Sequence, residues 1–138
     1  MAKTEILASA TAENKGGIYK TNITAGNHIL LADEPKEYGG GETGPSPADY
    51  LCMALASCKA ITIRMYAQRK GWKVDTVTVT AKLVKGSQMA SGLNTFFCSI
   101  KLTGELNDEQ RKRILEISKA CPVDRMLHKT NDVITVME

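Results

Sequence analysis

SPADYLCMALASCKAITIRMYAQRKGW, residues 46–72, is the stretch that decides the fold, because it predicts one long helix with both ends marked. Ser46 is a favourable N-cap, Pro47 suits the first helical position, and Asp49 lies near the positive end of the helix dipole. From residue 50 to residue 66 the side chains are apolar or small on nearly every face. We therefore expect this helix to be buried in the middle of the fold and to end at the glycine that follows the basic QRK.

The residues before this helix predict strands and then a loop. Short runs separated by Asn, Gly and Lys clusters indicate a β meander at residues 4–10, 16–24 and 27–32. The next stretch, DEPKEYGGGETGPSP at residues 33–47, is rich in glycine and proline and has no apolar periodicity. Structureless loops of this length are uncommon in compact domains and are often functional.

The residues after the helix predict a hairpin and two further helices. Apolar and polar side chains alternate in residues 77–84 and 95–103, as they do in half-buried strands. Residues 107–120 predict a helix with a capping-box pattern at its start, and a short helix is expected after the proline that follows it. Residues 132–138 predict a closing strand. This order of elements is typical of the α+β class.

Length and composition are those of a soluble protein with one domain, residues 1–138. The net charge of +3, from 18 basic and 15 acidic side chains, is scattered and gives no support for a nucleic-acid partner. No apolar run has the length of a signal peptide or a membrane span, so we expect a cytoplasmic protein with reduced cysteines and no membrane partner. The sequence also lacks the spacing of a metal site, since His28 and His128 lie far apart and no C-x-x-C occurs.

The four cysteines differ in their surroundings. Cys98 alternates with apolar residues on one strand face, and Cys52 is rotated away from Cys58 on the long helix, so packing is the expected role of both. Cys58 taken alone is also typical of a buried, inert thiol. Cys121 precedes a proline, and at the N-cap of a new helix its sulfur would face unpaired backbone N–H groups, which favour the thiolate. The pattern equally fits a cysteine that merely ends a helix.

Three motifs together resemble the OsmC/Ohr family of osmotically induced and organic-hydroperoxide-resistance proteins. They are ADEPKEYGGGETGPSP at residues 32–47, GPSPADYLCMALASCKAITIRMYAQRKGW at residues 44–72, and ACPVDRML at residues 120–127. The pattern closest to this one is that of the OsmC-like branch. The resemblance extends from about His28 to the C-terminus, and the order of strands and helices agrees with it throughout.

The resemblance implies an OsmC-like fold, an intertwined homodimer in which both subunits build each active site, and thiol peroxidase chemistry without metal, haem or flavin. By this match Cys58 is the peroxidatic cysteine and Cys121 the resolving cysteine. The Cys58 thiolate would reduce an organic hydroperoxide and become a sulfenic acid, which condenses with Cys121 to a disulfide. An external dithiol would then restore both thiols.

The family uses an arginine from the N-terminal half to hold the thiolate, and this chain has no arginine before Arg64. A buried thiolate needs a cation, so we expect Arg125 first, then Arg64, then Lys36 to supply the charge. Asp49 lies one position after the family's helix-starting glutamate, which Ala48 replaces, and would act through a bridging residue or as a helix-terminal anion.

Two other functions remain open from the sequence. The same fold could serve as a non-catalytic dimer that binds an apolar ligand in a cysteine-lined cleft, and the missing arginine favours that function. A Cys/His acyl-transfer or hydrolytic enzyme would need His28 or His128 within reach of a cysteine. Because the sequence contains no oxyanion motif, this function ranks last.

Overall fold

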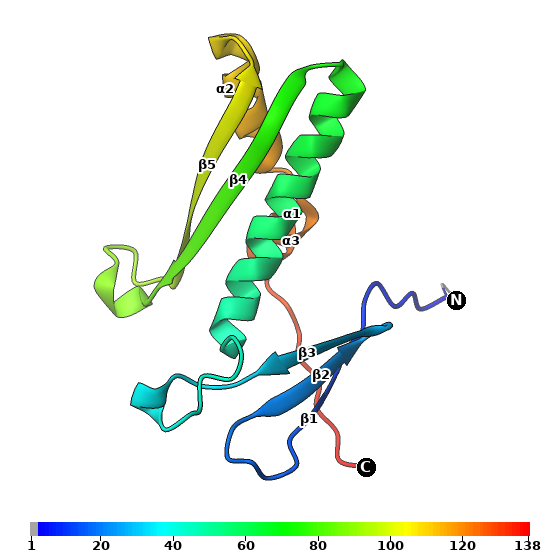
Figure 1. Cartoon of the computed structure of the whole chain (residues 1–138), viewed down its shortest axis with the longest axis vertical. Coiled ribbons are helices and arrows are strands. Elements are labelled where there is room, and N and C mark those ends of the chain that lie inside the picture. Colours follow the sequence, from blue (N-terminus) through cyan, green and yellow to red (C-terminus); the bar gives the residue numbers. More distant parts are fainter. Residues whose placement is uncertain (1–2) are drawn as a thin grey trace. The chain divides into compact units, whose positions relative to one another are not determined.

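The computed structural model of the protein describes residues 3–138, which divide into two compact units between Tyr50 and Leu51. The first unit contains an antiparallel sheet with the strand order β1-β2-β3 (Figure 1). Its strands are β1 (Thr11–Glu13), β2 (Thr21–Ala25) and β3 (His28–Ala32).

The predicted meander is confirmed in part. The strand expected at residues 27–32 is present, but the expected strand at residues 4–10 is wrong, because that segment forms no regular structure. The second strand begins five residues later than expected. The cause is the side-chain amide of Asn14, which donates to the carbonyl oxygens of Ile18 and Lys20 and holds the connection as a loop.

The glycine-rich loop after β3 is organised by one carboxylate. Asp33 accepts hydrogen bonds from the Thr43 hydroxyl (2.6 Å) and from the backbone N–H groups of Glu34 (2.8 Å) and Thr43 (3.2 Å). These bonds lower the pKa of Asp33 to about 2. The loop includes a 3-10 turn, η1 (Lys36–Tyr38), and Gly40, where a Cβ would collide with the backbone carbonyl group of Glu34. The expected structureless loop is therefore closely folded.

The long helix α1 (Pro47–Lys70) has the ends that its sequence predicts. At its start, the Asp49 backbone N–H donates to the Ser46 hydroxyl (3.2 Å), and the Ser46 N–H donates to the Asp49 carboxylate (3.0 Å). At its end, Gly71 has a φ of 68°, a conformation that glycine adopts without steric cost. Among the helices of residues 3–138, none combines the length and hydropathy of a membrane span.

A hairpin and two helices complete the second unit, and α1 runs along the hairpin (Figure 1). The elements are β4 (Lys73–Val84), the 3-10 turn η2 (Gly86–Gln88), β5 (Thr95–Glu105), α2 (Asp108–Ser118) and α3 (Pro122–Leu127). The predicted hairpin, both helices and the capping box of Asn107 with Gln110 are confirmed. The buried core joins α1, β4 and α2 through Ile63, Ala67, Val74 and Ile114.

α1 is less buried than its sequence predicts. Its buried face consists of residues four positions apart, Leu55, Lys59, Ile63 and Ala67. On the opposite face, Ile61 and Met65 expose 57% and 59% of their surfaces. The difference arises because the core of the described chain contacts one side of the helix, and an apolar sequence does not by itself provide a second packing surface.

The strand expected at residues 132–138 is also wrong, because residues 130–138 have no regular structure. The segment contains Val133 and Ile134, which expose 90% and 87% of their surfaces. A strand needs a pairing partner as well as a suitable sequence, and within residues 3–138 this segment pairs with no other strand.

Candidate active site

Two of the four cysteines meet within the second unit. Cys58 lies on α1, and Cys121 is the N-cap of α3. Both are free thiols; Cys121 is completely buried and Cys58 is half-buried. The Cys58 thiol is among the groups that raise the pKa of Cys121, which makes the two thiols close neighbours. The structure therefore brings together the two residues that the resemblance pairs.

Opposing influences act on the Cys121 thiol. Burial is the main cause that raises its pKa, and the interaction with Cys58 raises it further. The backbone N–H of Asp124, which donates to Cys121 Sγ at 3.4 Å, and the positive charge of Lys59 act in the opposite direction. The predicted N-cap position is confirmed, but its expected lowering of the pKa is outweighed by burial. The raised pKa favours the protonated thiol form of Cys121.

A buried lysine lies next to the thiol pair, and it is not among the site residues expected from the sequence. Lys59 is 5% exposed, and its ammonium group donates to the carbonyl oxygen of Ser118 (2.8 Å) and to the Asp124 carboxylate. A signal was present in the sequence. Lys59 is a charged residue inside an apolar run, directly after Cys58 and four residues from Leu55, so it shares the buried face of α1.

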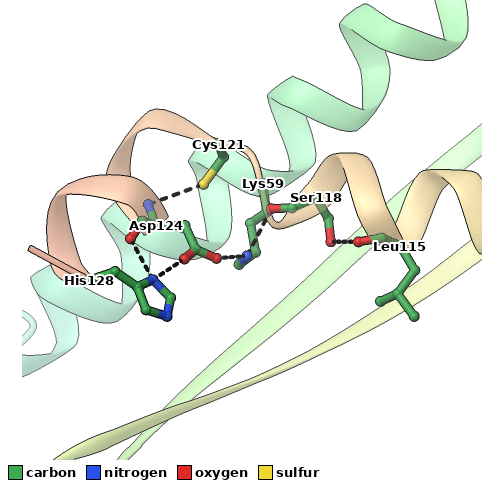
Figure 2. A network of polar contacts seen from close by, with 6 residues as sticks. All are labelled: Lys59, Leu115, Ser118, Cys121, Asp124 and His128. Atoms are coloured by element: carbon green, nitrogen blue, oxygen red, sulfur yellow. Dashed lines mark hydrogen bonds and ion pairs between the residues drawn. The ribbon is translucent and has the colours of Figure 1, made fainter.

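Asp124 connects this lysine to the second cysteine and to solvent (Figure 2). One carboxylate oxygen binds Lys59, the other lies 2.7 Å from Nδ1 of His128, and the backbone N–H binds Cys121. The His128 side chain is 81% exposed. Its Nδ1 also lies 3.0 Å from the Asp124 carbonyl oxygen, and both neighbours are acceptors, so Nδ1 carries the proton. The network thus runs from a buried thiol to the protein surface.

The other predicted site residues lie elsewhere. Arg125 is exposed on α3. The guanidinium group of Arg64 donates to two backbone carbonyl groups at the start of β4. Asp49 belongs to the N-terminal cap of α1, and Lys36 is exposed in η1 of the first unit. The structure therefore gives Arg64 and Asp49 contacts that account for them without a role at the thiols.

The expectation that Cys98 is a buried core residue is wrong, because its side chain is exposed. It does lie on the same strand as Phe96 and Ile100, and Ile100 packs against the core. Towards the start of β5, however, a groove of about 430 Å³ separates the strand from α1. The residues that line it include Leu55, Lys59, Phe96, Cys98, Asp124 and Leu127. Partial desolvation is the main cause that raises the pKa of Cys98. Cys52 is half-buried.

Metal binding finds no support in the described residues, where no three His, Cys, Asp or Glu side chains form a group that could hold an ion. His128 is engaged by Asp124, and His28 lies in β3 of the first unit.

A family comparison identifies the chain. Residues 39–136 match the family described as OsmC-like protein, and this match spans more than half of the sequence, including both Cys58 and Cys121. The chain belongs to the OsmC-like family. The resemblance seen in the motifs is therefore confirmed. No curated protein sequence matches the chain.

Solved structures show the same fold. A Psychrobacter arcticus protein named for osmotic stress induction and a detoxification response has a TM-score of 0.72 at 22% identity, over 91% of each chain. The organic hydroperoxide resistance protein OsmC of Legionella pneumophila has a TM-score of 0.62 at 18% identity, over 91% of each chain. The organic hydroperoxide resistance protein OhrB of Bacillus subtilis has a TM-score of 0.59 at 16% identity, over 88% of this chain and 90% of that one. The expected α+β, OsmC-like fold is confirmed.

Proposed function

We propose that this OsmC-like protein is a thiol-dependent peroxidase that reduces organic hydroperoxides to alcohols, with Cys58 as the peroxidatic and Cys121 as the resolving cysteine. The observation that carries the proposal is the proximity of these two free thiols, one on α1 and one at the N-cap of α3, where Cys58 is close enough to raise the pKa of Cys121. The names of solved OsmC-like structures that refer to organic hydroperoxide resistance support the choice of substrate.

The reaction needs two electrons and no resident cofactor. The Cys58 thiolate attacks the outer oxygen of ROOH; an S–O bond forms, the O–O bond breaks, and the leaving RO⁻ takes a proton to become ROH. The Cys121 thiol then displaces water from the Cys58 sulfenic acid and forms a disulfide. An external dithiol reduces this disulfide and becomes oxidised in turn.

The surroundings of the two sulfur atoms support the roles that the family resemblance implies. Cys121 is completely buried with a raised pKa, so it is a poor first nucleophile and a good proton donor to Cys58. Cys58 is half-buried, so a substrate can reach it. A location in the cytoplasm would keep both thiols reduced between turnovers.

The test is consumption of cumene hydroperoxide by the purified protein with a dithiol such as dithiothreitol. Wild type should turn over, Cys58→Ser should be inactive, and Cys121→Ser should lose disulfide formation. Cys52→Ser is the matched control on the same helix and should retain activity. If Cys58→Ser consumes peroxide as fast as wild type does, the proposed mechanism is wrong.

A second candidate function is a non-catalytic module that binds an apolar ligand. The groove beside Cys98 favours it, because apolar side chains of Leu55, Phe96 and Leu127 line a space of about 430 Å³. Binding of a fluorescent apolar probe that Leu127→Asp abolishes, together with an inactive wild type in the peroxide assay, would favour this function over catalysis.

We also propose a homodimer. The exposed apolar face of α1, which contains Ala54, Ile61 and Met65, has the spacing of a helix-packing stripe. A second copy of the chain could cover it, as the family resemblance implies, and this supplies the packing surface that the long apolar helix lacks in one subunit. The measurement is molar mass by light scattering.

A further inference from the structure

Lys59 is a charged side chain in a place that normally excludes charge. It is 5% exposed, and removing an ammonium group from water is unfavourable unless partners compensate for the lost hydration. The compensation comes from the Ser118 carbonyl oxygen and the Asp124 carboxylate. An apolar residue would fill the same position on α1 without these requirements, so the position of Lys59 points to a use of its charge.

Lys59 shares its carboxylate partner with a second side chain. Asp124 divides its two oxygens between Lys59 and the His128 ring, and its backbone N–H is directed at Cys121 Sγ. The ammonium group of Lys59 reaches thiols on more than one side of the lysine, since it opposes the rise in pKa of both Cys121 and Cys98, while Asp124 acts in the opposite direction at Cys98.

We propose that Lys59, held in place by Asp124, supplies the positive charge that keeps the Cys58–Cys121 pair reactive, in place of the arginine that the family pattern leads one to expect. The inference rests on the proposed function and extends it by naming the cation of the site. Asp124 is the positioning residue: it fixes the ammonium group with its side chain and the Cys121 sulfur with its backbone.

The other basic residues considered are less suited to this role. Arg64 is bound to backbone carbonyl groups of β4, and Arg125 is exposed to solvent, where water screens its charge. The titratable groups around Lys59 come from each element packed against it: Cys52 and Cys58 on α1, Cys98 on β5, and Cys121, Asp124 and His128 at α3.

The experiment measures thiol ionisation directly. In a Cys52→Ser/Cys98→Ser background only the Cys58–Cys121 pair contributes to the ultraviolet absorbance of thiolate, which is followed against pH. We expect Lys59→Met to move the midpoint of the first ionisation to higher pH, and a midpoint higher by about one pH unit slows alkylation of Cys58 at neutral pH by about tenfold. Asp124→Asn removes a negative charge and should move the midpoint to lower pH. A purely structural role for the ion pair does not predict that the midpoints of Lys59→Met and Asp124→Asn shift in opposite directions.

Control variants complete the comparison. Arg69→Met removes an exposed positive charge from the same helix and should leave the profile unchanged. Arg125→Met tests the rival cation. If Lys59→Met does not fold, Lys59→Gln removes the positive charge but keeps a side-chain N–H donor for the Ser118 carbonyl oxygen and the Asp124 carboxylate, and it should still show the raised midpoint. An unchanged midpoint in the folded Lys59 variant, or an equal change in Arg125→Met, overturns the inference.

This readout is independent of turnover. A wild type that does not consume hydroperoxide refutes the proposed function, whereas the ionisation profile still decides whether Lys59 sets the charge of the thiols.

Discussion

Lys59 and Asp124 form an ion pair whose side chains are almost completely buried, although 65 residues separate them in the sequence. The pair joins α1 to α3, the two helices that hold the thiols. Cys58 directly precedes the lysine, and Cys121 lies at the N-cap three residues before the aspartate. The contact that neutralises a buried charge is therefore also the contact that brings the two cysteines together.

Breaking this ion pair from one side should destabilise the protein strongly. Lys59→Met leaves the Asp124 carboxylate buried without its cation, and such single changes cost about 3–5 kcal/mol of unfolding free energy. Lys59→Met/Asp124→Leu removes both charges and should recover most of that loss. Urea denaturation followed by circular dichroism measures the free energy of unfolding of the wild type, the single variant and the double variant. A double variant no more stable than Lys59→Met would show that packing, not charge pairing, is what the lysine provides.

Peroxide should connect two particular cysteines. One equivalent of hydroperoxide is expected to produce a Cys58–Cys121 disulfide, because Cys58 is close enough to Cys121 to influence its pKa, while Cys52 and Cys98 stay reduced. Peptide mapping after alkylation of the remaining thiols reads out the pairing. A dominant disulfide that includes Cys98 would assign the resolving role to the exposed thiol in the groove.

Cys98 and Cys121 should react with a thiol label at different rates in the reduced protein, because one is exposed and the other is buried. At high pH, where both thiols ionise, a maleimide should modify the exposed Cys98 in the native state and modify Cys121 only after unfolding. Mass spectrometry of the labelled peptides shows which of the two cysteines is modified first. Native-state labelling of Cys121 as fast as that of Cys98 contradicts the burial on which the assignment of roles depends.

Local signals explain which elements the sequence could predict. The cap of α1 at Ser46, the glycine stop at residue 71 and the capping box at Asn107 depend on short-range hydrogen bonds, and all three are present. The strands expected at residues 4–10 and 132–138 depend on partners elsewhere in space, which alternation of side chains does not supply.

The site residues also fall into those that local signals predict and those that depend on distant partners. Cys121 could be placed at an N-cap from the proline that follows it, since that constraint is local. The apolar run around Lys59 indicates a buried charge, but the sequence does not identify its partner, because Asp124 lies 65 residues away. The exposure of Cys98 could not be predicted either. The alternation of side chains correctly placed Cys98 on one strand with Phe96 and Ile100, but it carries no information about the groove beside that strand.

The glycine-rich loop should loosen in acid. The pKa of Asp33 is lowered to about 2, below the ordinary 3.8, so folding favours its ionised form. Its contribution to stability is fully present above the ordinary pKa and is lost as the pH falls towards 2. Asp33→Asn should reproduce this loss at neutral pH, with faster hydrogen exchange at the Thr43 amide. Unchanged exchange in Asp33→Asn would mean that the glycine-rich backbone holds the loop without the carboxylate.

The exposed face of α1 provides the test of the homodimer. Met65 is 59% exposed on an apolar stripe. A charge at this position costs little in a monomer that leaves it in water, whereas in a dimer it would be buried without a partner. Met65→Glu should therefore convert a dimer of the wild-type chain to a monomer without lowering its helical content. Lys112→Gln, at an exposed position on α2, lowers the net charge by the same single unit and should remain dimeric. Light scattering at several concentrations gives the molar masses. If wild type and Met65→Glu are both monomers, the stripe is not a dimer interface, and a site built by two subunits is excluded.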